Sequence, residues 1–314
     1  MRKIFAVLLI VLFSHELCYR LIGWLNRRYG WIDSVFLMYP ASARYLYAYC
    51  PPAIARYCRW RPVWVGMGRQ QGGRWMLMFA VPNVEKEFLQ PKHEPQLRTL
   101  LARMQRIQQL VGATQHSFAG VLPSVMAARN LRADAPERVV TVMAVEAAVT
   151  QLIVEQGLPI QMRIVVLGGA GFIGAPVVTQ LRARGHQVVV VDPQASSTWP
   201  DEWEGLPTIL LNISRKNAIY QYIEKTWPHM ILLNEVYPAP SPRAIELLAA
   251  RGVPSFHLVG LAGQAWPSFP ESYQGAIPCC AGQAKITPQV ILRRLDARVQ
   301  DDADTLPNTA WDGA

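Results

Sequence analysis

Residues 168–174, with the sequence GGAGFIG, have the types and spacing of a phosphate-binding turn. The apolar run 164–167 before them is long enough for a buried parallel strand. Gly168 would allow a tight turn off that strand, Gly171 would let the backbone approach a pyrophosphate, and Gly174 would let the next helix pack closely on the strand. The N-terminus of that helix would offer free N–H groups and a partial positive charge to phosphates.

An acidic residue after a second strand completes this pattern. The apolar run 187–191 ends at Asp192, where a carboxylate commonly binds the ribose hydroxyls of a dinucleotide. Because a carboxylate repels a 2′-phosphate, Asp192 favours NAD over NADP, although NADP also fits the turn. The alternative is a domain of this build that binds nothing. The predicted contacts to the dinucleotide are Gly168, Ala170, Gly171, Phe172, Ile173, Gly174, Asp192 and Asn234.

The turn GGAGFIG resembles the fingerprint of the extended short-chain dehydrogenase/reductase and epimerase families, over about 30 residues. That resemblance implies a Rossmann domain and an NAD(P) cofactor. Those families also carry a Tyr-x-x-x-Lys pair, and here Tyr220, Tyr222, Tyr237 and Tyr273 are not followed by lysine at that spacing. Proton transfer by a Tyr/Lys pair is therefore not expected.

Alternating strands and helices continue after Asp192. The sequence predicts strands over 208–213, 229–236 and 254–263, and helices over 214–227 and 241–252. This order is typical of an α/β fold with a doubly wound parallel sheet, which binds ligands at the carboxyl ends of its strands. Asn234 and Glu235 would then lie near the nicotinamide; alternatively, Asn234 caps a turn and Glu235 is solvated.

Three further residues are candidates for catalysis. His116 is a candidate acid/base because its ordinary pKa lies near neutrality, and Cys279 and Cys280 could attack a thioester or aldehyde. The alternatives are a structural histidine and two buried thiols. Since the other cysteines have no metal-ligand spacing, no metal site is predicted. The chain has five cysteines, an odd number without a disulfide framework, which favours a reducing compartment.

The first quarter of the chain differs from the rest in charge and aromatic content. Residues 1–75 contain 11 Lys+Arg and 2 Asp+Glu, and 15 of the 30 aromatic residues; the remainder has no net charge. Such a segment suits nucleic acid or a membrane surface. The apolar run 4–13 favours the membrane and argues against nucleic acid.

The run 4–13 is too short and too interrupted for a full span, and no small-residue cleavage site follows it. We therefore expect a monotopic anchor, with a buried helix, a true span and a signal peptide as the alternatives. Residues 34–52 fit a second interfacial stretch and a packed core equally well.

Residues 76–162 fit a smaller mixed α/β lobe, with a strand over 74–82, an amphipathic helix over 94–112, a loop over 113–124 and a connecting helix over 138–157. This layout resembles glutamyl-tRNA reductase, shikimate dehydrogenase and, more closely, long-chain acyl-[acyl-carrier-protein] reductase. The predicted domains are a basic, aromatic hydrophobic segment at 1–75, a substrate lobe at 76–162, a Rossmann domain at 163–300 and an acidic disordered tail at 301–314.

Together these features predict a membrane-associated NAD(P)-dependent oxidoreductase on the cytoplasmic face. Its substrate would be a lipophilic molecule with a carbonyl or thioester group. The alternatives are a non-catalytic nucleotide-binding sensor or scaffold, and an epimerase-like enzyme with tightly bound NAD. Oligomeric state is not predicted.

Overall fold

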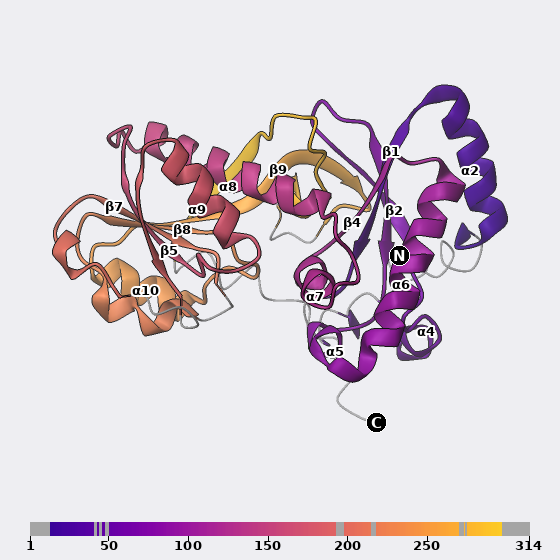
Figure 1. Ribbon diagram of the computed structural model, residues 1–314, viewed down its shortest axis with the longest axis horizontal. Coiled ribbons are helices and arrows are strands. Elements are labelled where there is room, and N and C mark those ends of the chain that lie inside the picture. The colour runs from indigo at the N-terminus through magenta and orange to yellow at the C-terminus, as the bar shows by residue number, and fades with distance from the viewer. Residues whose placement is uncertain are drawn as a thin grey trace. The chain divides into compact units, whose positions relative to one another are not determined.

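The structure, a computed structural model, describes residues 13–40, 43, 46–47, 50–192, 198–214, 218–269, 273 and 275–296 (Figure 1). The chain forms two compact units. The first comprises Met1–Thr141 with Leu261–Gln289, and the second Val142–Gly260 with Val290–Ala314. We call them the N-terminal unit and the nucleotide unit. The domain ranges predicted from composition stay a prediction.

The nucleotide unit contains the predicted parallel sheet. Its strands are β5 (Arg163–Leu167), β6 (Gln187–Val191), β7 (Thr208–Asn212), β8 (Met230–Asn234) and the first part of β9 (Ser255–Trp266). They lie in the order β6-β5-β7-β8-β9, all parallel, and β11 (Val290–Leu295) also pairs with β9. The switch point of this order lies between β5 and β7, so the carboxyl ends of those strands flank the expected ligand crevice.

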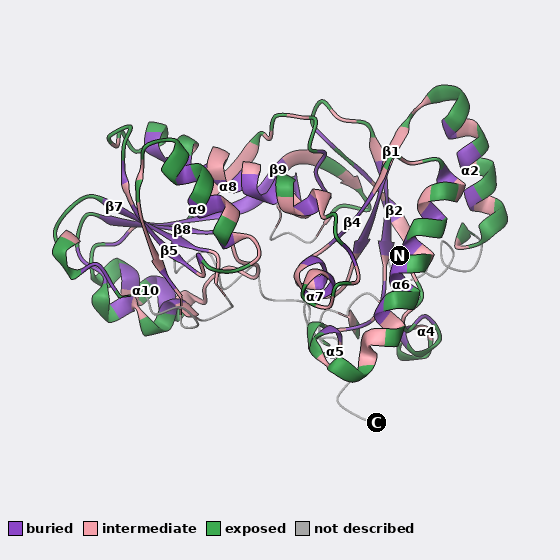
Figure 2. Cartoon of the chain, viewed as in Figure 1, coloured by how far each residue is buried: buried purple, intermediate pink, exposed green. Residues whose placement is uncertain are grey.

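Both faces of this sheet are covered. Every residue of β7 and β8 is buried, as parallel strands between two helical layers require (Figure 2). Helix α10 (Pro242–Ala250), capped by the Ser241 hydroxyl, buries Ala244, Ile245 and Leu248 against the face that carries Val165 and Leu232. Helix α9 (Gly174–Ala183) buries Val177, Val178 and Leu181. The α/β fold with a doubly wound sheet is confirmed.

The prediction of a helix over 214–227 is wrong for the residues of that segment that the structure describes. That segment forms two 3₁₀ turns, η3 (Ala218–Gln221) and η4 (Ile223–Lys225), and η2 (Asp201–Trp203) precedes β7. Long-range hydrogen bonds end the second turn, because Trp227 Nε1 donates to the Leu206 carbonyl and Arg251 donates to the Thr226 carbonyl. These tertiary contacts override the helical spacing of the sequence.

The N-terminal unit has its own sheet, with the strand order β4-β1-β3-β2-β9. Strand β1 (Ile32–Met38) pairs in parallel with β3 (Trp75–Ala80) and β4 (Gln115–Phe118), whereas β2 (Val63–Gln70) is antiparallel to β3 and to the second part of β9. Short strand β10 (Ala276–Ile277) pairs with β9. The chain passes between the units through α8 (Pro136–Glu155) and through β9.

Helices α2 (Glu16–Tyr29) and α6 (Glu94–Val111) pack together over one face of this sheet. One buried amide, Asn26, fixes α2: its Nδ2 donates to the carbonyls of Ile32, Val111 and Gly112, and its Oδ1 accepts from the Ile32 N–H at 2.7 Å. The shorter helices of the unit are α4 (Pro52–Tyr57), α5 (Glu85–Leu89), η1 (Pro91–His93), α7 (Leu122–Ala128) and η6 (Cys279–Ala281).

The structure distinguishes between the alternatives left open for the N-terminal quarter. Within the stretch 34–52, Val35, Phe36 and Leu37 are fully buried in a central strand, so this part is packed core and not an interfacial segment. The predicted loop 113–124 contains strand β4 and the start of α7 instead. Among the described helices, none combines the length and the hydropathy needed to cross a bilayer. Residues 4–12 and the tail 301–314 lie outside the described residues.

Candidate functional site

The glycine turn after β5 has the geometry that each glycine of the pattern predicts. Gly168 has a φ of +80°, which an L side chain rarely adopts, and the Gly171 N–H donates to the Gly168 carbonyl at 3.0 Å. A Cβ on Gly174 would lie 2.1 Å from that same carbonyl oxygen. Gly174 therefore lets α9 start directly against the turn.

The outer side of this turn is open. Ala170 and Gly171 are exposed, and a Cβ on Gly171 would meet only the Gly168 oxygen, at 3.1 Å, within 4 Å. The N-terminus of α9 lies at the same place and contributes a partial positive charge. The turn thus leaves space for a pyrophosphate and has the electrostatics to hold one, with Phe172 and Ile173 as the last residues before the helix.

Asp192 directly follows strand β6, the neighbour of β5 in the sheet. A backbone hydrogen bond joins the glycine turn to the end of β6, since the Gly168 N–H donates to the Val191 carbonyl at 2.9 Å. Asp192 is half-buried. A carboxylate next to the glycine turn is placed to accept hydrogen bonds from the ribose diol of a dinucleotide.

On the other side of the turn, a buried polar network joins the carboxyl ends of β7 and β8 to the paired residue of β9. Asn212 Nδ2 donates to Asn234 Oδ1 at 2.7 Å, and Asn234 Nδ2 donates to the Val236 carbonyl at 2.7 Å. His257 Nδ1 lies 3.0 Å from both Asn234 Nδ2 and the Asn234 backbone oxygen. Asn234 therefore organises the strand ends, whereas the cofactor contact expected of it stays a prediction.

Glu235 is the titratable group next to this network. Its N–H donates to the Asn212 carbonyl at 3.0 Å, and burial raises the pKa of its carboxyl to about 7. A carboxyl with this pKa exchanges its proton near neutrality, as an acid/base group must. Glu235 is half-buried, so it is neither the fully solvated group of the alternative nor a core residue, and its role stays a prediction.

Protonation of His257 should destabilise the nucleotide unit in mild acid. Burial lowers the pKa of His257 to about 4, so the unfolded chain binds the proton first, near pH 6.5, and stability is lost as pH falls from there toward 4. Between pH 7 and pH 5 we expect the wild type to lose about 1–2 kcal/mol more than His257→Gln. Urea unfolding at both pH values measures this difference. His229→Asn, at an exposed histidine, is the control, and equal losses in wild type and His257→Gln would contradict the prediction.

The three catalytic candidates of the N-terminal unit lie on two elements that contact each other. Strand β4, which carries His116, contacts the turn η6 that carries Cys279 and Cys280. Both cysteines are half-buried. His116 Nδ1 lies 2.5 Å from Gln108 Oε1, and its Nε2 is buried with no hydrogen-bond partner among the described residues. The structure thus brings together residues 163 positions apart in sequence.

Burial, assisted by Arg132, lowers the pKa of His116 to about 4, so its imidazole is neutral at pH 7. Arg132 lies in a second buried group that the sequence did not indicate. Its Nη2 donates to the His116 carbonyl at 3.0 Å, and its Nη1 pairs with Glu137 Oε1 at 2.8 Å. A catalytic role for His116, Cys279 or Cys280 stays a prediction.

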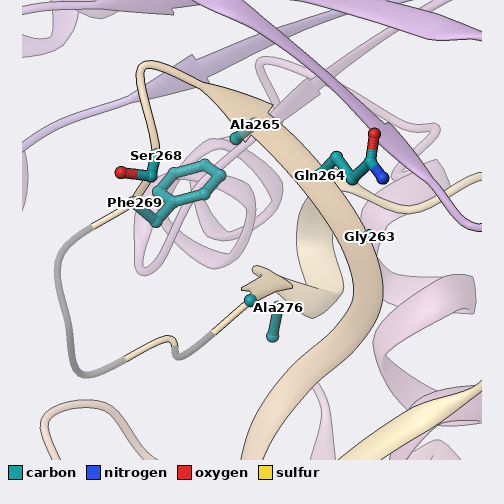
Figure 3. A pocket seen from close by; sticks show the side chains of 7 residues that line it. Gly263, Gln264, Ala265, Ser268, Phe269 and Ala276 are labelled. Atoms are coloured by element: carbon teal, nitrogen blue, oxygen red, sulfur yellow. The ribbon is translucent and has the colours of Figure 1, made fainter.

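The N-terminal unit also contains a pocket of about 210 Å³ beside β9. Figure 3 shows Ser268 and Phe269 on the loop after β9 and Ala276 on β10. The described lining is made of small or apolar residues with only Ser268 and Gln264 as polar side chains, and it includes no titratable group. The described lining of this pocket therefore offers no group for acid/base or nucleophilic catalysis.

Asn212 and His257 belong to the buried network beside the turn, and the sequence predicts His257 only as a core residue and gives Asn212 no role. A signal was present, because β7 and β8 both end in the same triplet, Leu-Leu-Asn. Their register pairs Asn212 with Asn234 and Asn234 with His257. Two parallel strands that end in the same amide place those amides side by side.

One family model matches part of the chain. The NAD dependent epimerase/dehydratase family matches residues 164–238, which run from β5 through the glycine turn to the end of β8. The expectation of NAD as cofactor is therefore supported by both the turn and the match. No curated protein matches the chain.

Several solved structures show weak likeness to the chain. An NAD-dependent malic enzyme from Thermotoga maritima is 14% identical with a TM-score of 0.39, over 79% of this chain and 73% of that one. Glutamate dehydrogenase from Thermus thermophilus is 14% identical with a TM-score of 0.38, over 71% and 63%. The FolD dehydrogenase/cyclohydrolase from Campylobacter jejuni is 12% identical with a TM-score of 0.34, over 76% and 86%. These scores are too low to support a function.

Proposed function

We propose that this chain is an NAD(P)-dependent oxidoreductase that transfers a hydride between the nicotinamide and a carbonyl carbon. The observation that carries the proposal is the juxtaposition of an open glycine turn with a buried polar network and a carboxyl at neighbouring strand ends. Gly171 would approach the pyrophosphate, and Asp192 would bind the adenosine ribose. A bound nicotinamide would supply or accept the hydride.

Residues of the chain itself position the strand ends and hold the proton that the reaction consumes or releases. Asn212 and Asn234 hold the ends of β7 and β8 in register, which fixes the backbone that carries Glu235. Reduction of a carbonyl consumes one proton at oxygen, and oxidation of an alcohol releases one. Glu235, with its pKa raised to about 7, is the group we propose to hold that proton.

We further propose a lipophilic carbonyl or thioester substrate. The support is the sequence layout that resembles acyl-[acyl-carrier-protein] reductases, together with the contact between β4 and η6. With a thioester, the thiol of Cys279 or Cys280 would attack the acyl carbon and expel the carrier thiol, which takes up the proton, so that an acyl-enzyme forms.

The family match over residues 164–238 favours one competing function, an epimerase-like reaction with tightly held NAD. Such an enzyme would oxidise and reduce the same carbon, and its cofactor would leave the protein only on denaturation. A nucleotide sensor without catalysis is the third candidate.

Calorimetric titration with NADH and NADPH tests the proposal. Gly171→Asp places a carboxylate where the pyrophosphate would lie, although its Cβ fits the turn, so affinity should fall at least about tenfold while folding is retained. Gly205→Asp is the control for the added charge. It lies before the amino end of β7 with no atom within 4 Å of an added Cβ, and its φ of +77° adds a backbone strain that Gly171 does not have, so its folding is checked in the same way.

The wild type should bind NADH more tightly than NADPH, because of Asp192. Cofactor that copurifies and resists dialysis would favour the epimerase alternative. No binding of either nucleotide to cofactor-free protein, or equal affinity in wild type and Gly171→Asp, would overturn the proposal.

A further inference from the structure

We propose that the outer face of α2 is a docking surface for an anionic lipid bilayer. Leu17, Leu21 and Trp24 are 68%, 60% and 63% exposed, although they belong to a well-packed helix. Their spacing of four and three residues places them in one line on the helix. We call these three side chains the α2 stripe.

The α2 stripe lies opposite the side by which the helix is held. Tyr19, Gly23 and Asn26 are buried, and a Cβ on Gly23 would lie 1.8 Å from the Leu110 carbonyl oxygen. The Asn26 hydrogen bonds anchor the end of α2 to α6 and β1. The helix therefore has no freedom to turn its apolar stripe inward, and Figure 2 shows its outer side exposed.

Aromatic residues extend this surface beyond the end of the helix. Tyr29 and Trp31 stack at a centroid distance of 4.6 Å with an interplanar angle of 10°, and they are 56% and 55% exposed. Tyrosine and tryptophan favour the headgroup level of a bilayer, where one end of the ring is apolar and the other is wet.

The charges of α2 indicate the sign of the partner. The helix carries one acidic residue, Glu16, and three arginines. Glu16 is paired with both Arg20 and Arg106, at 3.6 Å each, whereas Arg27 and Arg28 lie exposed in the last turn. Since all of the chain's excess positive charge lies within residues 1–75, anionic headgroups are the complementary partner.

A bilayer fits this surface better than a second copy of the chain. By helical spacing Arg28 continues the α2 stripe, four residues after Trp24, so a dimer packed through this stripe would cover two arginines, one from each copy, with an apolar surface. In a bilayer the same geometry is favourable, with apolar side chains among the acyl chains and arginines at the phosphates. The proposal does not depend on the oxidoreductase function, because vesicle binding needs no nucleotide.

Flotation of the full-length protein with vesicles tests this surface. Vesicles of phosphatidylcholine mixed with phosphatidylglycerol should carry the wild type, and vesicles of phosphatidylcholine alone should carry much less. The triple variant Leu17→Gln, Leu21→Gln, Trp24→Gln should bind the mixed vesicles at least about tenfold more weakly. Circular dichroism and NADH titration check that this variant is folded.

The matched control is Leu89→Gln, Val154→Gln, Ile160→Gln, which removes three other exposed apolar side chains. It should bind vesicles like the wild type. Arg27→Gln with Arg28→Gln should reduce binding to mixed vesicles and leave the weak binding to phosphatidylcholine unchanged. Equal binding of wild type and triple variant would overturn the proposal. The proposal would also be overturned if the wild type did not bind the mixed vesicles, or if the wild type formed dimers and the triple variant did not.

Discussion

Arg132→Met is expected to destabilise the N-terminal unit by about 3–5 kcal/mol, because it leaves a buried carboxylate without its counter-charge. The side chains of Arg132 and Glu137 are 4% and 2% exposed, and Arg132 also donates to the carbonyl of His116 on edge strand β4. Burial raises the pKa of Glu137, and Arg132 offsets part of that rise. Without Arg132 the unit should therefore regain stability as pH is lowered and Glu137 takes up a proton.

Hydrogen exchange at the amides of β4 measures this effect within the N-terminal unit. The double variant Arg132→Met, Glu137→Leu removes both charges and should recover most of the lost protection, since a buried pair can be replaced by apolar groups at little cost. The prediction is wrong if Arg132→Met exchanges like the wild type, or if the double variant is less protected than the single one.

Gly174→Ala is expected to weaken NADH binding at least about tenfold and to destabilise the nucleotide unit by about 1–3 kcal/mol. The new methyl carbon would lie 2.1 Å from the Gly168 oxygen and 2.8 Å from the Gly169 Cα, and both are backbone atoms. To make room, the turn must open, which breaks the Gly171-to-Gly168 hydrogen bond. Calorimetric titration and urea unfolding measure the two effects.

Gly171→Ala is the control for this prediction. Its added carbon meets one atom, the Gly168 oxygen, at 3.1 Å, so the turn should keep its shape and its stability. If Gly174→Ala were as stable as Gly171→Ala and bound NADH as tightly, close packing at Gly174 would not be what this turn requires.

Local signals in the sequence predict the glycine turn of the nucleotide unit and helix α6 of the N-terminal unit well. The glycine turn lies between β5 and α9 as expected, and α6 covers Glu94–Val111 where 94–112 was predicted, since Gly112 ends the helix at a φ of +69°. In such segments the capping residue and the hydrophobic period are close neighbours in sequence. They determine the element before any tertiary contact forms.

Contacts between distant residues were not predictable in this way. Ile219, Ile223 and Trp227 are buried at a helical spacing, yet the chain forms 3₁₀ turns there. The Asn212–Asn234–His257 network depends on strand register, which a single sequence leaves open, and the Arg132–Glu137 pair depends on how the chain before α8 packs against β4. In the same way, the apolar β1 has the composition of an interfacial segment, and only its pairing with β3 and β4 shows that it is core.

The division of the N-terminal unit into two stretches of chain has a consequence for its synthesis on the ribosome. Its sheet is completed by residues 263–266, which pair with β2, and by Gln283, whose N–H donates to Gln70 Oε1 across 213 positions. Until those residues emerge, β2 has an unpaired edge, and open strand edges promote aggregation. Strands β5 to β8 of the nucleotide sheet are synthesised during that interval, so they emerge while the sheet of the N-terminal unit is still incomplete.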